Sequence, residues 1–275
     1  MILKKFCNKS FLTRLLSGIL LVIIALVTII SGNDILFATT LIISLIGLFE
    51  MYRVFGIEKK APGYIGYVAT VVYYILLRAG MLQYMLIFII LFIMCLMILY
   101  VFSFPKVKTE EITNSLFSVL YIAVMLSFIY SVRMGENGFY NVWLIFLCSW
   151  GSDTCAYVVG VAIGKHKMAP VLSPKKSVEG AVGGIVGAAL LGFIYASVFK
   201  NNILSGDLDV RIAYPLICMA GACISMVGDL AASAIKRNHN IKDYGTLIPG
   251  HGGIMDRFDS VIFVAPVIWL LVEMF

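Results

Sequence analysis

The sequence predicts an all-α, polytopic integral membrane protein, and three observations lead to this fold class. Of the 275 residues, 61% are hydrophobic and only 13% are charged, and the mean hydropathy is +0.99. Apolar runs such as residues 15–30 and 81–104 match the length scale of about 20 residues with which a helix crosses a hydrocarbon core. Apolar and polar residues do not alternate within these runs, which argues against the strands of a membrane β-barrel.

Nine apolar segments are separated by short polar loops, and each segment is expected to form one membrane-spanning helix. They lie near residues 12–31, 35–52, 63–79, 82–103, 112–131, 139–163, 179–199, 211–234 and 254–274. The first segment follows a basic start but lacks a persuasive small-residue cleavage site. We therefore interpret it as a retained span rather than a removed signal peptide.

Lysine and arginine are distributed unequally between the two sides of this topology. The N-terminus and the even-numbered loops hold 17 of them, and the odd-numbered loops hold 4. By the positive-inside rule, the N-terminus lies in the cytoplasm and the C-terminus lies outside. The net charge of +6 is accounted for by cytoplasmic loops that face an anionic leaflet, so no nucleic-acid partner is expected.

Ionisable side chains divide the chain into two regions. Spans before about residue 148 are nearly free of such groups in their interiors, whereas later spans carry several carboxylates within or at their ends. These carboxylates are Asp153, Glu179, Asp229, Asp256 and Asp259. Carboxylates at membrane depth are costly and usually have a function. We therefore expect a scaffold at residues 1–135, with contacts for a homodimer, and a catalytic region with one shared site at residues 136–275.

Asp229 lies in an apolar segment that ends in two cations. On a helix, Ser233, Lys236 and Arg237 follow Asp229 at i+4, i+7 and i+8, so the four side chains share a face. This face would carry a deep carboxylate with positive charge above it, toward the cytoplasm. The alternative is an aspartate that is paired with a lysine to stabilise the helix bundle.

The segment IPGHGGIMDRFD, residues 248–259, begins with a turn and continues into the last span. Its proline and its glycines at 250, 252 and 253 disfavour a regular helix and permit positive φ. Bare glycine backbone would let a bulky anion come close. Asp256 and Asp259 then stand at i and i+3 in the first turn of the span, where free N–H groups can face a phosphate.

Two carboxylates that face a third, Asp229, would suit Mg²⁺, which prefers oxygen ligands and often shares them with substrate phosphates. The alternative is a helix-capping aspartate with a salt bridge to Arg257. That alternative explains Asp256 or Asp259 singly, but it explains the neighbouring His251–Gly252–Gly253 poorly.

The segment at residues 150–180 combines a deep carboxylate, Asp153, with a basic loop. Four side chains of this loop could hold phosphate oxygens: Ser173, Lys175, Lys176 and Ser177. Ser177 or Glu179 could also cap the next helix. For any single lysine, the alternative is a solvated cytoplasmic loop. The glycines at 180, 183, 184 and 187 are better explained by helix packing than by ligand contact.

Soluble nucleotide-binding motifs are absent from the sequence. No GxxxxGK[ST] loop occurs, and no GxGxxG follows a predicted strand. A nucleotide would therefore be bound without a soluble nucleotide-binding fold.

The C-terminal motif resembles the signature of phosphatidate cytidylyltransferases, also called CDP-diacylglycerol synthases. The matching residues are Ser233, Lys236–Arg237, Lys242–Asp243, Gly245, Pro249, His251–Gly252–Gly253 and Asp256–Arg257–x–Asp259. An upstream segment is also similar, at Asp153–Thr154, Ala156–Tyr157, Gly164–Lys165, Ser173–Pro174–Lys175–Lys176 and Glu179–Gly180. The chain departs at Ser177–Val178–Glu179–Gly180, where the family often has Thr-Trp-Glu-Gly. The close match covers roughly residues 148–262.

This resemblance implies that CTP and phosphatidic acid condense to CDP-diacylglycerol and pyrophosphate, with Mg²⁺, in phospholipid biosynthesis. It implies a bacterial cytoplasmic (inner) membrane, with the active site facing the cytoplasm. The attacking phosphate oxygen is already largely ionised at neutral pH, so positioning and electrostatics would supply the catalysis. By analogy with other phosphoryl-type transfers, metal ions would clamp the attacking and leaving oxygens.

The resemblance also assigns roles to individual residues. It implies Asp229 and Asp256 as principal metal ligands, together with Asp259, and it is compatible with a monovalent cation such as K⁺ beside Mg²⁺. The catalytic set would be Asp229, Asp256, Lys236 and Lys242. The substrate-binding set would be Ser173, Lys175, Lys176, Ser233, Arg237, His251, Gly252, Gly253, Arg257 and Asp153.

Two other functions remain open from the sequence. A cation-coupled transporter or ion channel would explain Asp153 and Asp229, but not the basic, glycine-rich loop. A CTP-dependent kinase acting on a polyprenol or similar lipid alcohol would transfer the γ-phosphoryl group of CTP and would need a base for the hydroxyl. Labelled CTP distinguishes them, because only a cytidylyltransferase brings the cytidine moiety into lipid.

Overall fold

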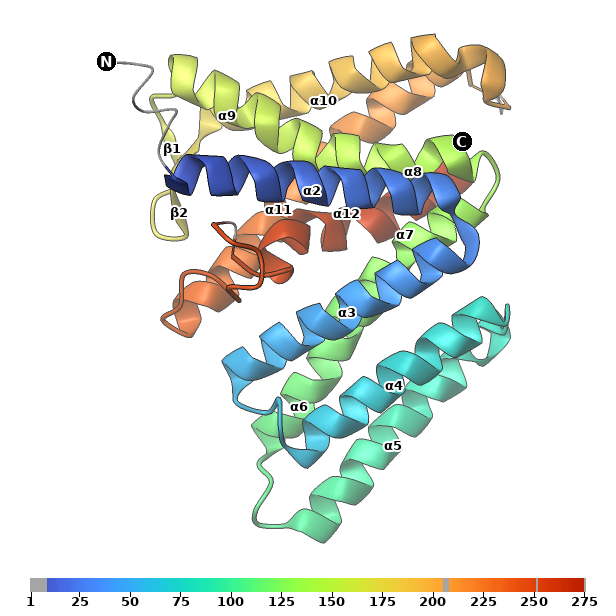
Figure 1. The fold of residues 1–275 in the computed structure, drawn as a ribbon, viewed down its shortest axis with the longest axis vertical. Coiled ribbons are helices and arrows are strands. Elements are labelled where there is room, and N and C mark those ends of the chain that lie inside the picture. Colours follow the sequence, from blue (N-terminus) through green and yellow to red (C-terminus); the bar gives the residue numbers. More distant parts are fainter. Residues whose placement is uncertain (1–8, 205–207, 251, 275) are drawn as a thin grey trace. The chain divides into compact units, whose positions relative to one another are not determined.

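The computed structural model describes residues 9–204, 208–250 and 252–274, with side chains from residue 17 onward. Its regular elements are helices and one small hairpin, joined by loops (Figure 1). The first helices are α2 (Lys9–Ser31), α3 (Asn33–Phe55), α4 (Ala61–Arg78), the 3₁₀ turn η1 (Leu82–Tyr84), α5 (Met85–Ser103), α6 (Thr109–Ser118), the π-helical η2 (Val119–Val124) and α7 (Met125–Met134). They are followed by α8 (Gly138–Phe146), the π-helical η3 (Leu147–Gly151), α9 (Ser152–Ile163), α10 (Val178–Phe199), the 3₁₀ turn η4 (Lys200–Asn202), α11 (Val210–Asn238) and α12 (Met255–Met274).

Six helical stretches in the described residues are long and apolar enough to cross a membrane. They are Asn33–Phe55, Leu82–Ser103, Thr109–Met134, Gly138–Ile163, Val178–Asn202 and Val210–Asn238. The predicted all-α polytopic membrane fold is therefore confirmed. Helices also cover the three other segments expected to span, at α2, α4 and α12, but they fall outside this set of six, so nine spans stays a prediction.

The basic segment that the sequence predicts as a loop contains a two-stranded antiparallel hairpin. Strand β1 (Lys167–Ala169) pairs with β2 (Ser173–Ser177), with Lys167 opposite Ser177 and Ala169 opposite Ser173. The strands are only three and five residues long. Such short strands show no apolar alternation in the sequence, which explains why they were not predicted.

By its internal contacts the chain divides into two units, and each is described by itself. The first unit comprises Met1–Ser127 and Asp243–Arg257. In it, α3 packs against α4, α6 and η2, and α4 also packs against α5. Buried hydroxyls pair across these helices: Ser44 of α3 bonds Tyr74 of α4 at 2.8 Å, and Tyr52 of α3 bonds Ser115 of α6 at 3.2 Å. Polar pairs of this kind satisfy groups that could otherwise find no partner in an apolar interior.

The second unit comprises Phe128–Lys242 and Phe258–Phe275. Helix α10 is its centre, packed against α9 and α11. A Cβ atom at Gly184 would lie 3.0 Å from the Cβ of Ala156, and one at Gly187 would press on the side chain of Cys155. These glycines let α9 and α10 approach closely, which confirms that the series is used for helix packing.

Candidate active site

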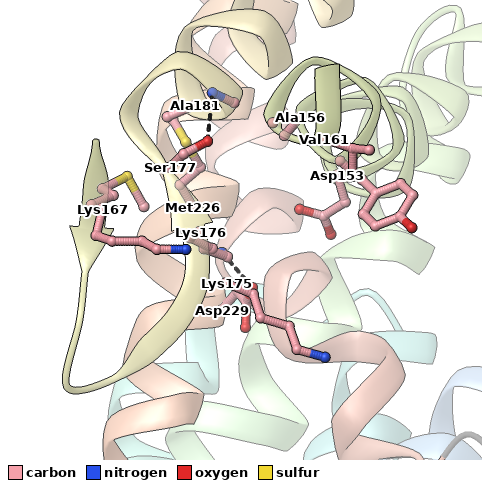
Figure 2. Close-up of a pocket in the computed structure, with 14 residues that line it drawn as sticks. Asp153, Ala156, Val161, Lys167, Lys175, Lys176, Ser177, Ala181, Met226 and Asp229 are labelled. Carbon is pink, nitrogen blue, oxygen red and sulfur yellow. Dashed lines mark hydrogen bonds and ion pairs between the residues drawn. The ribbon is translucent and has the colours of Figure 1, made fainter. Parts of the chain in front are cut away.

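A cavity of about 550 Å³ opens in the second unit, between α9, the hairpin, the start of α10 and α11 (Figure 2). It is lined by Asp153, Ala156, Tyr157, Gly160, Val161, Lys167, Met168, Lys175, Lys176, Ser177, Gly180, Ala181, Met226 and Asp229. Five of the polar side chains that the sequence singled out therefore share one cavity: Asp153, Lys175, Lys176, Ser177 and Asp229. Figure 2 shows the Asp153 carboxylate projecting from α9 into the space that the hairpin faces.

Asp229 lies on α11 and forms an ion pair with Lys176 of the hairpin. Both side chains are about three-quarters buried, with 25% and 23% of their surface exposed. Ser233, one helical turn later, donates its hydroxyl to Asp229 at 3.4 Å, which confirms that these two residues share a helix face. The pairing with a lysine that the sequence left open is thus present, and the lysine comes from the hairpin.

Further charge lies close to Asp229 within the second unit. Asp259, in the first turns of α12, interacts electrostatically with Asp229, Lys236 and Asp153. Lys236 is only 8% exposed. Asp259 thus lies within electrostatic range of two other carboxylates, and such a grouping of negative charge favours the binding of cations.

The hairpin contributes more to the cavity than the sequence analysis assigned. Lys167, which was not in the predicted site, lines the cavity, and Figure 2 shows its side chain extending inward from β1. The only sequence signal for it was its place in the basic loop. Ser173, which was predicted to bind substrate, lies at the other end of β2, opposite Ala169.

Two side chains predicted as helix caps both have structural roles at the base of the hairpin. Ser177 is the N-cap of α10, and its hydroxyl accepts a hydrogen bond from the Gly180 N–H at 3.2 Å. Glu179 accepts bonds from the backbone N–H groups of Lys165 and His166, and its carboxylate lies 2.6 Å from the His166 ring. Ser177 thus caps α10, and Glu179 ties the segment that follows α9 to the first turn of α10.

Asp256 lies in the first unit, where it binds backbone groups of the glycine-rich loop. Its Oδ2 atom accepts hydrogen bonds from the N–H groups of Tyr244, at 2.8 Å, and Gly253, at 3.0 Å. Gly252 has a φ of 85°, and a Cβ atom there would lie 2.7 Å from the same oxygen. The prediction of positive φ is confirmed at Gly250 and Gly252. In this structure the space beside the glycine backbone, which was predicted to admit an anion, is occupied by the Asp256 carboxylate.

A second carboxylate, Glu50 of α3, meets the same loop and was missed by sequence reasoning. It is 3% exposed, and its two oxygens accept bonds from the N–H groups of Ile254, at 3.1 Å, and Met255, at 2.9 Å. Glu50 is the one acidic or basic residue between Asp34 and Arg53 in an apolar segment, and that isolation was an available signal.

The remaining predicted residues have different surroundings. Arg237 is exposed and donates to the Ile241 carbonyl oxygen at 3.1 Å, so it closes the end of α11, and Lys242 is exposed nearby. Arg257 is partly buried, and His251 lies outside the described residues.

Of the predicted metal ligands, Asp229 and Asp259 belong to the second unit and Asp256 to the first. Among the residues that the structure describes, no three or more acidic, histidine or cysteine side chains gather at a common ligand distance. The carboxylates of the second unit are thus within electrostatic range of one another without forming a ready-made metal cage.

The fold and the cavity define a class: a polytopic helical membrane protein with lysines and carboxylates around one pocket, as binding of polyanions requires. Comparison with known proteins then identifies the family. The model of the cytidylyltransferase family matches residues 12–275, and the chain belongs to this family. The match reaches beyond the region of close resemblance noted in the sequence, and it makes the chain a nucleotidyltransferase.

The similar proteins are named as phosphatidate cytidylyltransferases, which are members of this class of enzyme. The chain is 32% identical to the phosphatidate cytidylyltransferase of Bacillus subtilis strain 168 over 273 residues, which cover 95% of this chain and 97% of that protein. It is 32% identical to the Staphylococcus aureus strain COL enzyme over 94% of this chain and 97% of that protein. It is 36% identical to the Haemophilus influenzae enzyme over 62% of each. These relatives confirm the family resemblance of the sequence.

Proposed function

We propose that the chain is a phosphatidate cytidylyltransferase, which condenses CTP with phosphatidic acid to give CDP-diacylglycerol and pyrophosphate. The observation that carries this proposal is the similarity to the Bacillus subtilis enzyme over 95% of the chain and 97% of that protein. The product is a precursor for phospholipids, so the reaction belongs to phospholipid biosynthesis.

The cavity of the second unit supports this function by its chemistry. Lys167, Lys175 and Lys176 bring three ammonium groups to it, and phosphate oxygens are their natural partners. Val161 and Met226 add apolar surface to the same cavity. A lining that combines cations with apolar side chains suits a lipid phosphate, which has a charged head and hydrocarbon chains.

The reaction needs little proton chemistry. A phosphate oxygen of phosphatidate attacks the α-phosphorus of CTP, a new P–O–P bond forms, and the bond to the β-phosphate breaks, so that its electron pair leaves with pyrophosphate. The chain must bring two polyanions together and offset their charge. In this proposal Lys175 and Lys176, with Ser173, bind phosphatidate or the triphosphate. Lys236, Arg237 and Lys242 serve the phosphates of CTP and the leaving pyrophosphate. The other proposed substrate-binding residues are Ser233, His251, Gly252, Gly253, Arg257 and Asp153.

The carboxylates fit a divalent cation by their donor chemistry. Asp229, Asp259 and Asp153 present hard oxygen atoms whose mutual repulsion is offset in this structure by Lys176 and Lys236. As the family resemblance implies, we propose that Asp229 and Asp256, with Asp259, hold Mg²⁺, and that a monovalent cation such as K⁺ accompanies it. Mg²⁺ would neutralise charge on the triphosphate.

The placement in the membrane is also part of the proposal. Nine spans, with the N-terminus in the cytoplasm and the C-terminus outside, would put the hairpin on the cytoplasmic side, where CTP is available. The 17 lysines and arginines assigned to that side support this orientation. The bacterial relatives support a bacterial cytoplasmic (inner) membrane, and a homodimer is the oligomeric state that we propose.

Labelled CTP tests the proposal directly. The purified protein in lipid nanodiscs, with phosphatidic acid and Mg²⁺, should transfer label from the cytidine ring into lipid and release pyrophosphate. If only the γ-phosphoryl label entered lipid, with a lipid alcohol as the acceptor, the chain would be a lipid kinase instead. Uptake of cations into vesicles without lipid labelling would favour a transporter.

A further inference from the structure

We infer that Glu50 is a positioning residue for the segment from Tyr244 to Asp256, called here the signature loop, and that the reaction depends on it. The inference rests on the proposed function, because the loop carries the signature glycines and Asp256. It gives a residue of the N-terminal region, residues 1–135, a part in the chemistry, where the sequence predicted only a scaffold.

The first observation is the two-pronged contact between Glu50 and the start of α12. One carboxylate oxygen accepts from the Ile254 N–H at 3.1 Å and the other from the Met255 N–H at 2.9 Å. N–H groups at the start of a helix have no partner within the helix, and the helix dipole favours a negative charge there. The Glu50 side chain is only 3% exposed, and its negative charge is stabilised by the positive end of the helix dipole at the first turn of α12.

The second observation is the space that two glycines leave for this carboxylate. A Cβ atom at Gly253 would lie 2.5 Å from the Glu50 carboxyl carbon, and one at Gly245 would lie 2.9 Å from it. Real Cβ atoms do not approach so closely, so neither position tolerates a side chain while Glu50 keeps its place. Both glycines belong to the signature motif, and Glu50 supplies a physical reason for them.

The third observation is a second tether from the same helix. Arg53, three residues after Glu50 on α3, donates to the Tyr244 carbonyl oxygen at 2.6 Å. Glu50 thus holds the end of the loop and Arg53 holds its beginning. Asp256 closes the loop between them, since its Oδ2 atom accepts from both Tyr244 and Gly253.

The consequence is that Glu50 acts through Asp256 rather than on a substrate. Glutamine at position 50 would keep one acceptor oxygen but would turn an NH₂ group toward the other backbone N–H, so one donor would face another donor. A buried donor without its acceptor is costly. The start of α12 would then loosen, and Asp256 with it.

The test compares Glu50→Gln with Ser44→Ala in nanodiscs. Ser44 is also buried on α3, but its hydroxyl bonds Tyr74 rather than the loop. We expect Glu50→Gln to lower kcat at least about tenfold, to raise the Mg²⁺ concentration needed for half-maximal rate, and to speed hydrogen exchange in peptides covering residues 244–256. Ser44→Ala should lower thermal stability without changing exchange of that loop or kcat.

Two results would overturn the inference: a Glu50→Gln protein with wild-type kcat, or one that loses kcat while loop exchange stays at the wild-type level. If Glu50→Gln does not fold, Arg53→Gln removes the exposed second tether; faster exchange near residue 244 with reduced kcat supports the inference, and no change in either refutes it. A wild-type protein that makes no CDP-diacylglycerol would refute the proposed function instead, and the exchange comparison would still decide whether Glu50 holds the loop.

Discussion

At the scale of single residues, aspartates that look alike in the sequence have different partners in the structure. Asp229 is bound by two side chains, the Lys176 ammonium group and the Ser233 hydroxyl. Asp256 is bound by backbone N–H groups of its own loop. A side-chain partner can swing away when a cation or phosphate arrives, whereas a backbone partner moves only with the loop. If variants of Asp229 and Asp256 lost activity equally, the causes of the two losses would therefore differ.

The first prediction contrasts Asp229→Asn with Asp256→Asn. Both should abolish turnover, because each removes a charge that we propose binds Mg²⁺. Asp256→Asn should nearly keep the wild-type melting temperature, because both backbone N–H groups bond the same oxygen, Oδ2, whose place the amide oxygen can take. Asp256→Ala should lower the melting temperature, since it leaves both buried N–H groups without this acceptor at a cost of about 1–3 kcal/mol. Thermal unfolding in detergent followed by fluorescence measures this difference. A wild-type melting temperature in Asp256→Ala would mean that Asp256 does not stabilise the loop.

The second prediction concerns Lys167, which the structure adds to the site. Lys167→Gln removes one ammonium group from the cavity lining, so the KM for phosphatidic acid should rise by about tenfold, which corresponds to about 1.4 kcal/mol of binding. Lys59→Gln is the control, because Lys59 is an exposed lysine outside the cavity lining. An unchanged KM in Lys167→Gln would remove this residue from substrate binding.

Residues near one another in the sequence were the predictable part of the site. The Asp229–Ser233 contact follows from the helical repeat, and the positive φ of Gly250 and Gly252 follows from the absence of a side chain. Glu50 could not be placed in the same way. Its partners, Ile254 and Met255, are 204 and 205 residues away in the chain, and no local pattern encodes a contact over such a distance.

At the scale of elements, helix boundaries were predicted closely and the hairpin was not. Residues 82–103 were expected to span, and the structure has η1 and α5 over Leu82–Ser103. Helix α11 continues to Asn238, four residues past the expected end, because Lys236 and Arg237 stay helical where the hydropathy falls. Hydropathy locates apolar surface, whereas backbone hydrogen bonds continue until a capping feature stops them.

The third prediction concerns the contact between α9 and α10. Gly184→Val would push a side chain against Ala156 and Ser152, which lie 3.0–3.1 Å from the added Cβ atom. We expect a loss of about 1–3 kcal/mol in stability from overpacking, with reduced activity, since both helices line the cavity. The matched control is Val186→Leu on the exposed face of the same helix. Thermal unfolding of both variants checks this, and a stable Gly184→Val protein would contradict the packing role.

At the scale of the whole molecule, the sequence predicts which side of the membrane each loop faces. The 17 lysines and arginines on one predicted side outnumber the 4 on the other, and this asymmetry gave the predicted orientation. Six helical stretches of the described residues are long and apolar enough to cross a membrane. Whether the protein has nine spans therefore depends on whether α2, α4 and α12 also cross it.

The fourth prediction tests that count through the C-terminus. Alkaline phosphatase fused after the last residue should be active, because nine spans put that end outside the cytoplasm, and a green fluorescent protein fused there should be dark. Both reporters should behave in the opposite way when they are fused after residue 241, in the loop before α12. A fluorescent C-terminal fusion would mean an even number of spans.

The distance in sequence between Glu50 and its partners has a consequence for biogenesis. The first unit is built from two stretches of chain, and the second stretch, Asp243–Arg257, leaves the ribosome only after most of the second unit has been made. Until then the Glu50 carboxylate lies in an apolar helix without the N–H groups that it binds in the finished protein. We expect nascent chains that stop before residue 243 to be recognised as incomplete by membrane quality control, with Glu50 as the exposed signal.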